Sequence, residues 1–347
     1  MDLEQARGVK RELTSYARDL AERYGAVVRP SRVGGTEAAE AVRAPTLALG
    51  LAPVGDGAYT IAVRYRLGVP AARSIARRIA AEAGPEPDVR RTGRIRTLQE
   101  LGGAGDSVRP RPPVASAFAE GETGRVRPLR PGVSIGHVDV TAGTLGAFVL
   151  GPAGERYALS NFHVLAGSPS AAAGDVVVQP GPADGGDDPE DRVGTLARVA
   201  PLEEGVAAQV DAAVALLDDG IEIDATYPVG TITETAAATG GEAVAKIGRT
   251  TSHTQGRVSA IELDGVLVGY GEELGVLSFD DQIEIESAGE GPFSRGGDSG
   301  SLVYREDGLA LGLLFAGSET GGTNGTGLTY ANPISLVTST LDVRLYA

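Results

Sequence analysis

Gly297-Asp298-Ser299-Gly300 lies at the centre of the stretch that decides the fold, Phe293-Ser294-Arg295-Gly296-Gly297-Asp298-Ser299-Gly300-Ser301-Leu302-Val303. Glycines on both sides of the serine let the backbone turn sharply and let a ligand approach closely, which a nucleophilic hydroxyl requires. Glycine-rich turns are common in a chain with 50 glycines, so a hairpin turn is the alternative. The nucleophile reading needs a base and an orienting acid elsewhere in the chain.

Composition narrows the class of protein. The chain has 347 residues, enough for one large domain or for two or three smaller ones. Hydrophobic residues make up 42% and aromatic residues only 5%, so the cores are expected to consist mostly of Val, Leu, Ile and Ala. A formal net charge of −15 argues against nucleic acid or an anionic membrane as the main partner. The absence of cysteine excludes disulfides, cysteine nucleophiles and thiolate metal sites.

The sequence shows no recognisable targeting or membrane-spanning segment, and this sets the expected location. The first seven residues are charged and lack an apolar signal core. No run approaches the roughly eighteen apolar residues of a membrane span. We therefore expect a cytoplasmic protein without a membrane partner.

Residues 1–96 predict a small α+β domain. Helices are expected over residues 2–24 and 71–83, and strands over 46–51, 59–67 and 89–95. The first helix has one apolar stripe, which would pack on its own domain or on a second copy of the chain, so this domain is a candidate for homo-oligomer formation. The stripe consists of Leu3, Ala6, Val9, Leu13, Tyr16, Leu20 and Tyr24.

The remainder divides into a linker and a β-rich domain. Residues 97–131 are rich in Pro, Gly and Arg, which is typical of an extended linker. From residue 132 to 347, short apolar runs alternate with turns rich in Gly, Pro, Asp and Asn. This pattern predicts an all-β sandwich or barrel.

Two further residues are candidates for a reactive group. His163 follows an apolar run in Ser-Asn-Phe-His-Val-Leu, where a lone histidine is often structural. Asp211 stands just inside the apolar run Val-Asp-Ala-Ala-Val-Ala-Leu-Leu. Burying an unpaired acid is costly, so Asp211 needs a donor such as a histidine N–H, unless it is exposed at the start of a strand.

His163, Asp211 and Ser299 occur in that order, separated by 48 and 88 residues. With these local contexts the sequence resembles the trypsin-like, chymotrypsin-fold serine peptidases over about residues 132–345, because that family has the order His, Asp, Ser. Segments 310–318 and 327–334 resemble the strand that lines the specificity pocket and a late strand of bacterial members. Segments 178–186 and 246–256 resemble the plant NARROW LEAF 1-like group, which suggests a bacterial relative of that group.

The resemblance implies a mainly β fold of two antiparallel six-stranded β-barrels, preceded by the α+β domain. The first barrel would carry His163 and Asp211, and the second Ser299, with the active site between them. The implied activity is that of a trypsin-like hydrolase, a serine endopeptidase that acts on proteins or peptides through an acyl-enzyme, without a cofactor or metal. Backbone N–H groups of Gly297 and Ser299 would hold the oxyanion.

The same resemblance indicates where the substrate pocket would lie and how the enzyme would be activated. Phe293 would lie at the base of the pocket, with Phe315, Ala316 and Gly317 nearby, which favours a small or apolar substrate side chain. In secreted members the acid before the serine pairs with a new N-terminus, but no Ile-Val-Gly-Gly follows a basic residue here. We therefore expect an internal partner for Asp298 and no conventional zymogen activation.

Several alternatives stay open. His137 and His253 are expected to have structural or surface roles. The acidic loop over residues 184–191 would bind calcium or simply be solvated, and it lacks the EF-hand spacing. The chain would otherwise be a catalytically weak binding or scaffold protein, or a protease that processes its own linker or a partner encoded nearby. The N-terminal domain would recruit substrate, mediate oligomerisation or block the cleft.

Overall fold

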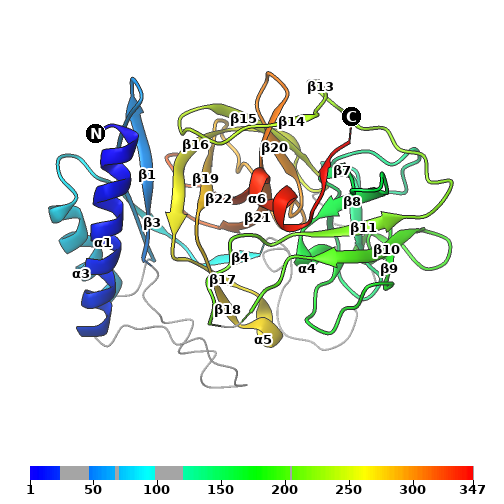
Figure 1. The fold of residues 1–347 in the computed structure, drawn as a ribbon, viewed down its shortest axis with the longest axis horizontal. Helices are drawn as coiled ribbons and strands as arrows, with labels where there is room; N and C mark the ends of the chain where they lie inside the picture. Colours follow the sequence, from blue (N-terminus) through cyan, green and yellow to red (C-terminus); the bar gives the residue numbers. More distant parts are fainter. Residues whose placement is uncertain (24–46, 67–69, 98–119, 204, 347) are drawn as a thin grey trace.

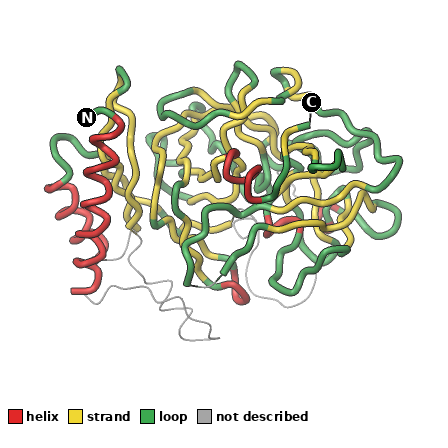
Figure 2. The backbone as a smooth tube through the Cα atoms, viewed as in Figure 1, coloured by secondary structure: helices red, strands yellow, loops and turns green. Residues whose placement is uncertain are grey.

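Strands outnumber helices in the described residues, and the two longest helices lie together at one end of the molecule (Figures 1 and 2). No helix in the described residues is long and apolar enough to cross a bilayer. Tyr24 of the predicted apolar stripe and most of the predicted linker lie outside the described residues. The structure is a computed structural model, and it describes residues 1–23, 47–66, 70–97, 120–203 and 205–346.

The prediction of a mainly β chain with a small α+β N-terminal unit is confirmed. The helices are α1 (Leu3–Arg23), α3 (Pro70–Glu82), α4 (Phe162–Leu165), α5 (Gly271–Leu274) and α6 (Ile334–Thr340), with a 3-10 turn η2 (Pro182–Asp184). The strands are β1 (Leu47–Gly55), β2 (Ala58–Arg66), β3 (Asp88–Thr92), β4 (Ile95–Thr97), β5 (Ser134–His137), β6 (Gly143–Thr144), β7 (Ala147–Leu150), β8 (Arg156–Ser160), β9 (Val176–Val178), β10 (Arg192–Val199), β11 (Ala213–Leu217), β12 (Thr226–Tyr227), β13 (Gly230–Thr231), β14 (Glu234–Thr235), β15 (Ala243–Gly248), β16 (Ser252–Asp264), β17 (Val266–Gly269), β18 (Val276–Phe279), β19 (Gln282–Ser287), β20 (Leu302–Tyr304), β21 (Leu309–Ser318), β22 (Thr329–Pro333) and β23 (Arg344–Leu345).

The N-terminal unit packs α1 and α3 against β1, β2 and β3 (Figure 1). Both predicted helices are confirmed, and the apolar stripe of α1 is buried at Ala6, Leu13 and Leu20. The β1–β2 hairpin turns at Asp56 and Gly57, which have φ of 50° and 71°. Two positive φ values at the centre of a two-residue loop give the turn that matches strand twist.

Six strands of the C-terminal half close into a barrel. Pairings run β15–β16–β19–β22–β21–β20, and β20 pairs back to β15. The other sheet has eight strands in the order β23-β7-β8-β11-β10-β9-β5-β6 and is curled, without pairing between its first and last strands in the described residues. The second predicted barrel therefore has the six strands expected of it. The first predicted barrel is instead a curled sheet of eight strands.

The N-terminal unit is attached to the closed barrel through its sheet. β1 pairs with the outer part of β16, with Leu51 opposite Ile261. A buried ion pair strengthens this attachment, since Arg64 Nε lies 2.7 Å from Glu284 Oε2 and the two side chains are 1% and 0% exposed. Ser259 Oγ donates to the same carboxylate at 2.7 Å. Buried charges need such complete pairing to offset the cost of desolvation.

β4 leaves the N-terminal unit and enters the larger sheet. The sequence predicts one strand over residues 89–95, but the structure has β3, which pairs with β2, and a separate β4. β4 lies between β21 and β17 (Figure 1), and it pairs antiparallel with β21 and parallel with β17. Residues 95–97 thus connect the N-terminal unit to the C-terminal half through pairings separate from that of β1 with β16.

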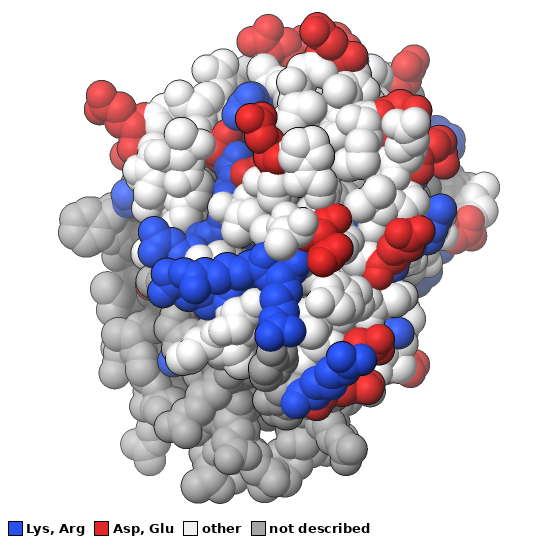
Figure 3. Space-filling model, turned by 90° about the vertical axis from the view of Figure 1, so that its left-hand side faces the viewer, with Lys and Arg blue, Asp and Glu red and all other residues white. Residues whose placement is uncertain are grey.

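Charge is distributed unevenly over the surface. Basic side chains gather on the face formed by the N-terminal unit (Figure 3), although the chain as a whole has a net charge of −15. The exposed arginines of α3 are Arg73, Arg77 and Arg78. The positive charge of the chain is therefore locally concentrated on this face.

Candidate active site

His163 and Asp211 are brought together by the pairing of β8 with β11. Ser160 at the end of β8 lies opposite Ala213 at the start of β11, so the residues that follow β8 and those that precede β11 emerge at the same end of the sheet. The short helix α4 then places His163 Nδ1 at 2.5 Å from Asp211 Oδ2. Both side chains are buried, with exposures of 3% and 0%.

Asp211 has further partners from both halves of the molecule. Tyr270 Oη, from the β17–β18 hairpin, donates to Asp211 Oδ2 at 2.5 Å. Asn161 Nδ2 donates to the Asp211 carbonyl at 2.7 Å, and the Asp211 N–H donates to Asn332 Oδ1 at 3.0 Å. These contacts fix the backbone and the side chain of Asp211 in one orientation toward His163.

Tyr270 also touches the imidazole. Its ring meets the His163 ring edge to face, with 6.0 Å between centroids, and stacks on Phe279. Burial raises the pKa of the Tyr270 hydroxyl well above its usual value, and the neighbouring Asp211 carboxylate raises it further. The hydroxyl therefore stays protonated and remains a donor to Asp211 at any ordinary pH.

Ser299 lies in a loop held against the end of β8. Gly297 and Gly300 have φ of 94° and 93°, a conformation that favours glycine, and a Cβ on Gly300 would lie 2.1 Å from Ser160 Oγ. Ser299 Oγ donates to the Phe315 carbonyl at 3.4 Å, and Nε2 of His163 has no hydrogen-bond partner among the described residues. The serine and the imidazole therefore do not hydrogen-bond to each other in this structure.

Thr144 anchors the serine loop to the first sheet. Its Oγ1 donates to the Gly297 carbonyl at 2.8 Å, and its N–H donates to the Ser299 carbonyl at 2.7 Å. The N–H groups of Gly297 and Ser299 donate no hydrogen bond within the part of the chain that the structure describes. These two N–H groups therefore keep an unused donor each, although both residues are buried.

Asp298 has the internal partner that the sequence predicts. Its Oδ1 accepts from the N–H groups of Thr250 and Thr251 at 3.0 and 3.1 Å. Its Oδ2 accepts from Thr251 Oγ1 at 2.7 Å and lies 3.5 Å from the ammonium of Lys246. Burial lowers the pKa of Lys246, and the charge of Asp298 opposes part of that effect. Lys246 on β15 therefore supplies the positive charge beside Asp298.

The predicted pocket residues are buried, and their assignment stays a prediction. Phe293 is buried in the core cluster that the barrel shares with the N-terminal unit, and its carbonyl accepts from Thr254 Oγ1 at 2.7 Å. Phe315 packs on Phe279 with 4.8 Å between centroids. Ala316 and Gly317 lie on β21, where β4 pairs with them.

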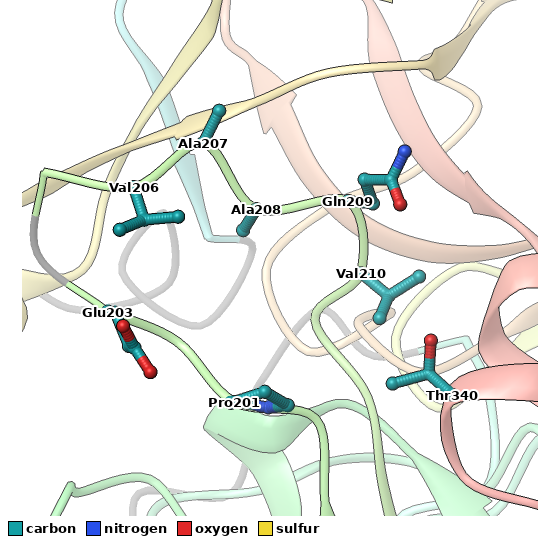
Figure 4. A pocket seen from close by; sticks show the side chains of 8 residues that line it. All are labelled: Pro201, Glu203, Val206, Ala207, Ala208, Gln209, Val210 and Thr340. Carbon is teal, nitrogen blue, oxygen red and sulfur yellow. The ribbon is translucent and has the colours of Figure 1, made fainter.

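A separate pocket lies beside the segment that leads to Asp211 (Figure 4). It has a volume of ≈ 280 Å³ and contains none of His163, Asp211 and Ser299. Residues of the loop before β11 surround it, with one residue from α6. Its lining residues are Pro201, Glu203, Val206, Ala207, Ala208, Gln209, Val210 and Thr340.

The remaining polar candidates form no hydrogen bond or ion pair with His163 or Ser299 within the described residues. His137 Nε2 lies 3.2 Å from Asp175 Oδ2, and His253 is exposed on β16. In the acidic loop, Asp184 pairs with Arg249 at 2.5 Å. Within the described residues, no group of three or more His, Asp or Glu side chains is arranged to hold a metal ion.

Sequence reasoning missed the residues that support the reactive groups. Lys246 had a usable signal, because it is one of only two lysines and interrupts an apolar run. Asn332 likewise interrupts a predicted strand. Tyr270 and Thr144 had no local signal, since their roles arise from contacts across 59 residues to Asp211 and 153 residues to Gly297.

Comparison with known proteins gives structural neighbours only. No protein-family model matches the chain, and no curated protein matches it. Thermobifida fusca protease A has a TM-score of 0.44 and 18% identity, covering 63% of this chain and 100% of that chain. Cellulomonas bogoriensis chymotrypsin has a TM-score of 0.43 and 19% identity, covering 63% and 99%. A glutamic acid-specific serine protease has a TM-score of 0.43 and 25% identity, covering 63% and 100%.

These neighbours are trypsin-like serine proteases, the group that the sequence resembles. The link to the NARROW LEAF 1-like group stays a prediction.

Proposed function

We propose that this chain is a trypsin-like serine endopeptidase that hydrolyses peptide bonds through His163, Asp211 and Ser299. The observation that carries the proposal is the 2.5 Å contact between His163 Nδ1 and Asp211 Oδ2, both buried, at the end of the sheet where the Ser299 loop is anchored. A base oriented by an acid beside a serine in a tight turn is the arrangement that nucleophilic catalysis requires.

The roles follow from the hydrogen bonds. Because Nδ1–H of His163 donates to Asp211, the neutral imidazole has its lone pair on Nε2, which has no partner among the described residues. Ser299 Oγ would exchange its long bond to the Phe315 carbonyl for one to Nε2 when substrate binds, since catalytic hydrogen bonds often tighten only in the complex. His163 then takes the hydroxyl proton as Oγ attacks the substrate carbonyl.

The intermediate and the leaving group are handled by the same residues. The N–H groups of Gly297 and Ser299 would donate to the oxyanion that forms on the carbonyl oxygen. The protonated His163 gives its proton to the leaving amine, which leaves an acyl-enzyme on Ser299. Water, deprotonated by His163, then attacks the ester and restores the serine. Asp211 stabilises the imidazolium in both steps because its charge is buried beside it.

A fluorophosphonate probe on purified protein tests the proposal. We expect labelling of the wild type, no labelling of Ser299→Ala, and loss of peptide turnover on the order of 10⁶-fold in that variant. Ser294→Ala is the matched control, because Ser294 lies in the same loop and bonds to Thr329 instead. A folded wild type that is not labelled and cleaves no member of a peptide library would contradict the peptidase proposal. It would favour the alternative of a binding or scaffold protein.

The same peptide library tests the specificity prediction. A pocket formed at Phe293, Phe315, Ala316 and Gly317 is expected to prefer small or apolar side chains before the cleaved bond, and a preference for Arg or Lys would contradict it. Intact mass of wild type and Ser299→Ala tests the self-processing alternative, because only the wild type would be cut.

Location and organisation also remain proposals. We place the protein in the cytoplasm on its sequence alone. We divide it into the α+β domain 1–96, the linker 97–131 and the peptidase domain 132–347, and we name the N-terminal domain as the candidate oligomer contact. Cell fractionation and sedimentation of the purified chain test the location and the oligomer.

A further inference from the structure

The guanidinium of Arg249 is fixed on one side by a buried carboxylate. Arg249 directly follows β15, and its Nε and Nη2 atoms donate to Asp184 Oδ2 and Oδ1 at 2.7 and 2.5 Å. Ser134 Oγ donates to the same carboxylate at 2.6 Å. The side chains of Arg249 and Asp184 are 7% and 1% exposed. Because a bidentate pair holds the plane of the guanidinium, the position of this cation is set before any ligand binds.

The remaining nitrogen of the guanidinium faces the serine loop. A Cβ on Gly297 would lie 2.1 Å from Arg249 Nη1, so Nη1 lies against the face of Gly297 where another residue would carry its side chain. Nη1 donates no hydrogen bond within the described residues, and unlike His163 Nε2 it is not fully buried. An arginine that is more than nine-tenths buried thus keeps one donor in contact with solvent, next to a glycine whose N–H is also unused.

The order of strands in the barrel places Arg249 on the other side of the serine loop from the predicted pocket. β20, which follows the Ser299 loop, pairs with β15 on one side and with β21 on the other. Arg249 continues from β15, whereas most of the predicted pocket, from Phe315 to Gly317, lies on β21. Since the substrate side chain before the cleaved bond is proposed to enter that pocket, the residues after the bond leave on the side of Arg249.

A carboxylate is the ligand that fits this nitrogen. Asp184 already uses two nitrogens of the guanidinium and balances its charge, so one charge-assisted donor remains. Charge-assisted hydrogen bonds are roughly twice as strong as neutral ones. The nearby acid Asp298 does not use this donor, because its oxygens are bonded to Thr251 and lie beside Lys246. The donor is therefore left for a group outside the described residues.

We propose that Arg249 is a specificity-determining residue that binds a carboxylate in the part of the substrate that follows the cleaved bond. Two sources supply such a carboxylate, namely an acidic side chain and the free C-terminus of a short leaving peptide. The inference rests on the proposed function for its place in the reaction, but binding of a carboxylate at Arg249 is measurable without cleavage.

Peptide binding to the Ser299→Ala protein tests the inference. Four fluorescein-labelled peptides share one sequence with an alanine before the bond to be cleaved. The two residues after that bond are both glutamate or both glutamine, and each version ends in a free or an amidated C-terminus. We expect the Kd to be at least about tenfold lower where the required carboxylate is present. A difference between glutamate and glutamine identifies an acidic side chain, and a difference between acid and amide identifies the C-terminus.

A double substitution removes the cation without leaving a charge unpaired. Arg249→Gln combined with Asp184→Asn deletes both members of the buried pair, and it should abolish the preference for a carboxylate. The matched control is Arg192→Gln with Asp218→Asn, an exposed arginine–aspartate pair at 2.8 Å, which should keep the preference. Thermal melting shows which variants are folded. Equal binding of all four peptides by the parent protein, or a preference that survives in the Arg249 variant, would overturn the inference.

The two proposals fail in different ways. In the Ser299-containing proteins we expect the same preference in kcat/KM, carried mainly by KM. An active wild type that cleaves all four peptides equally would leave the peptidase function standing and remove the role of Arg249. A carboxylate preference in binding, together with no turnover and no fluorophosphonate labelling, would support the carboxylate site and contradict the peptidase function.

Discussion

Asp211 and Asp298 are both completely buried, and they are held in opposite ways. Asp298 lies 3.5 Å from the Lys246 ammonium and accepts several N–H and hydroxyl bonds, so its charge is balanced within its own barrel. Asp211 accepts from the hydroxyl of Tyr270 and from the ring of His163. Its charge is balanced only when that ring becomes protonated.

The difference is that between a structural role, which the surroundings of Asp298 favour, and the reactive role proposed for Asp211. A buried carboxylate paired with a buried lysine stabilises one loop conformation, and losing either partner leaves an uncompensated charge. A buried carboxylate whose partners are neutral instead favours any positive charge that develops beside it. Asp298 should therefore matter mainly to the stability of the Ser299 loop, and Asp211 mainly to the chemistry at His163.

Asp211→Asn should have the largest effect on rate. An amide keeps the shape but favours the wrong imidazole tautomer, so we expect kcat to fall on the order of 10⁴-fold. Circular dichroism and melting temperature should change little. The control is Asp219→Asn, an exposed acid just beyond the far end of β11. An Asp211→Asn protein with wild-type kcat would remove Asp211 from the mechanism.

Asp298→Asn should instead reduce stability. It leaves Lys246 buried without its counter-charge, and breaking a buried pair costs about 3–5 kcal/mol. The free energy of unfolding in urea measures this loss. Lys246→Met combined with Asp298→Asn should cost less than the two single changes added together. Strictly additive losses would show that the two residues do not form a pair.

Tyr270→Phe sharpens the comparison because it removes one neutral donor from Asp211. A hydrogen bond to a charged group contributes about 1.5–3 kcal/mol, so we expect kcat to fall roughly tenfold or more, with KM nearly constant. If Tyr270 had only a structural role, the substitution would lower the melting temperature and leave kcat unchanged. Tyr65→Phe, in the N-terminal unit, serves as the control and should alter neither quantity.

The smallest expected effect is that of Glu286→Gln on the pH dependence of stability. Glu286 is a third acid with several partners, so it extends the comparison of Asp211 with Asp298. Burial alone would raise its pKa, but bonds from Thr323 and Arg257 and the charge of Arg90 lower it to about 2. A carboxyl whose pKa is lower in the folded than in the unfolded protein stabilises the fold at any pH above its unfolded pKa. This stabilisation is lost as the pH falls toward the folded pKa of about 2. Urea midpoints should decline from pH 5 to pH 3, and less steeply in Glu286→Gln.

The part of the site that the sequence predicts is the part marked by short local sequence patterns. His163, Asp211 and Ser299 each stand in a local pattern, and β8 and β11 bring two of them together through one antiparallel pairing. The helices and the β1–β2 hairpin follow from apolar spacing and turn residues.

The remainder depends on contacts that no local pattern encodes. Tyr270 reaches Asp211 only because the β17–β18 hairpin lies beside the segment before β11, where Ala208 bridges to Phe279. β4 has three residues and no alternation to mark its partner, so its insertion between β21 and β17 follows from the free strand edge that it fills. The eight-stranded first sheet likewise depends on β23, a two-residue strand at the far end of the chain.

The pairing of β1 with β16 has a consequence for shortened versions of the protein. β16 extends beyond the closed barrel, and β1 covers this extension with Leu49 opposite Asp264. A fragment that begins after β2 would expose the extension as an open strand edge beside buried apolar side chains such as Ile261 and Leu263. Open edges of this kind recruit other chains. β1 thus covers this edge, and we expect a fragment that lacks β1 and β2 to self-associate unless a charged residue is placed on that edge.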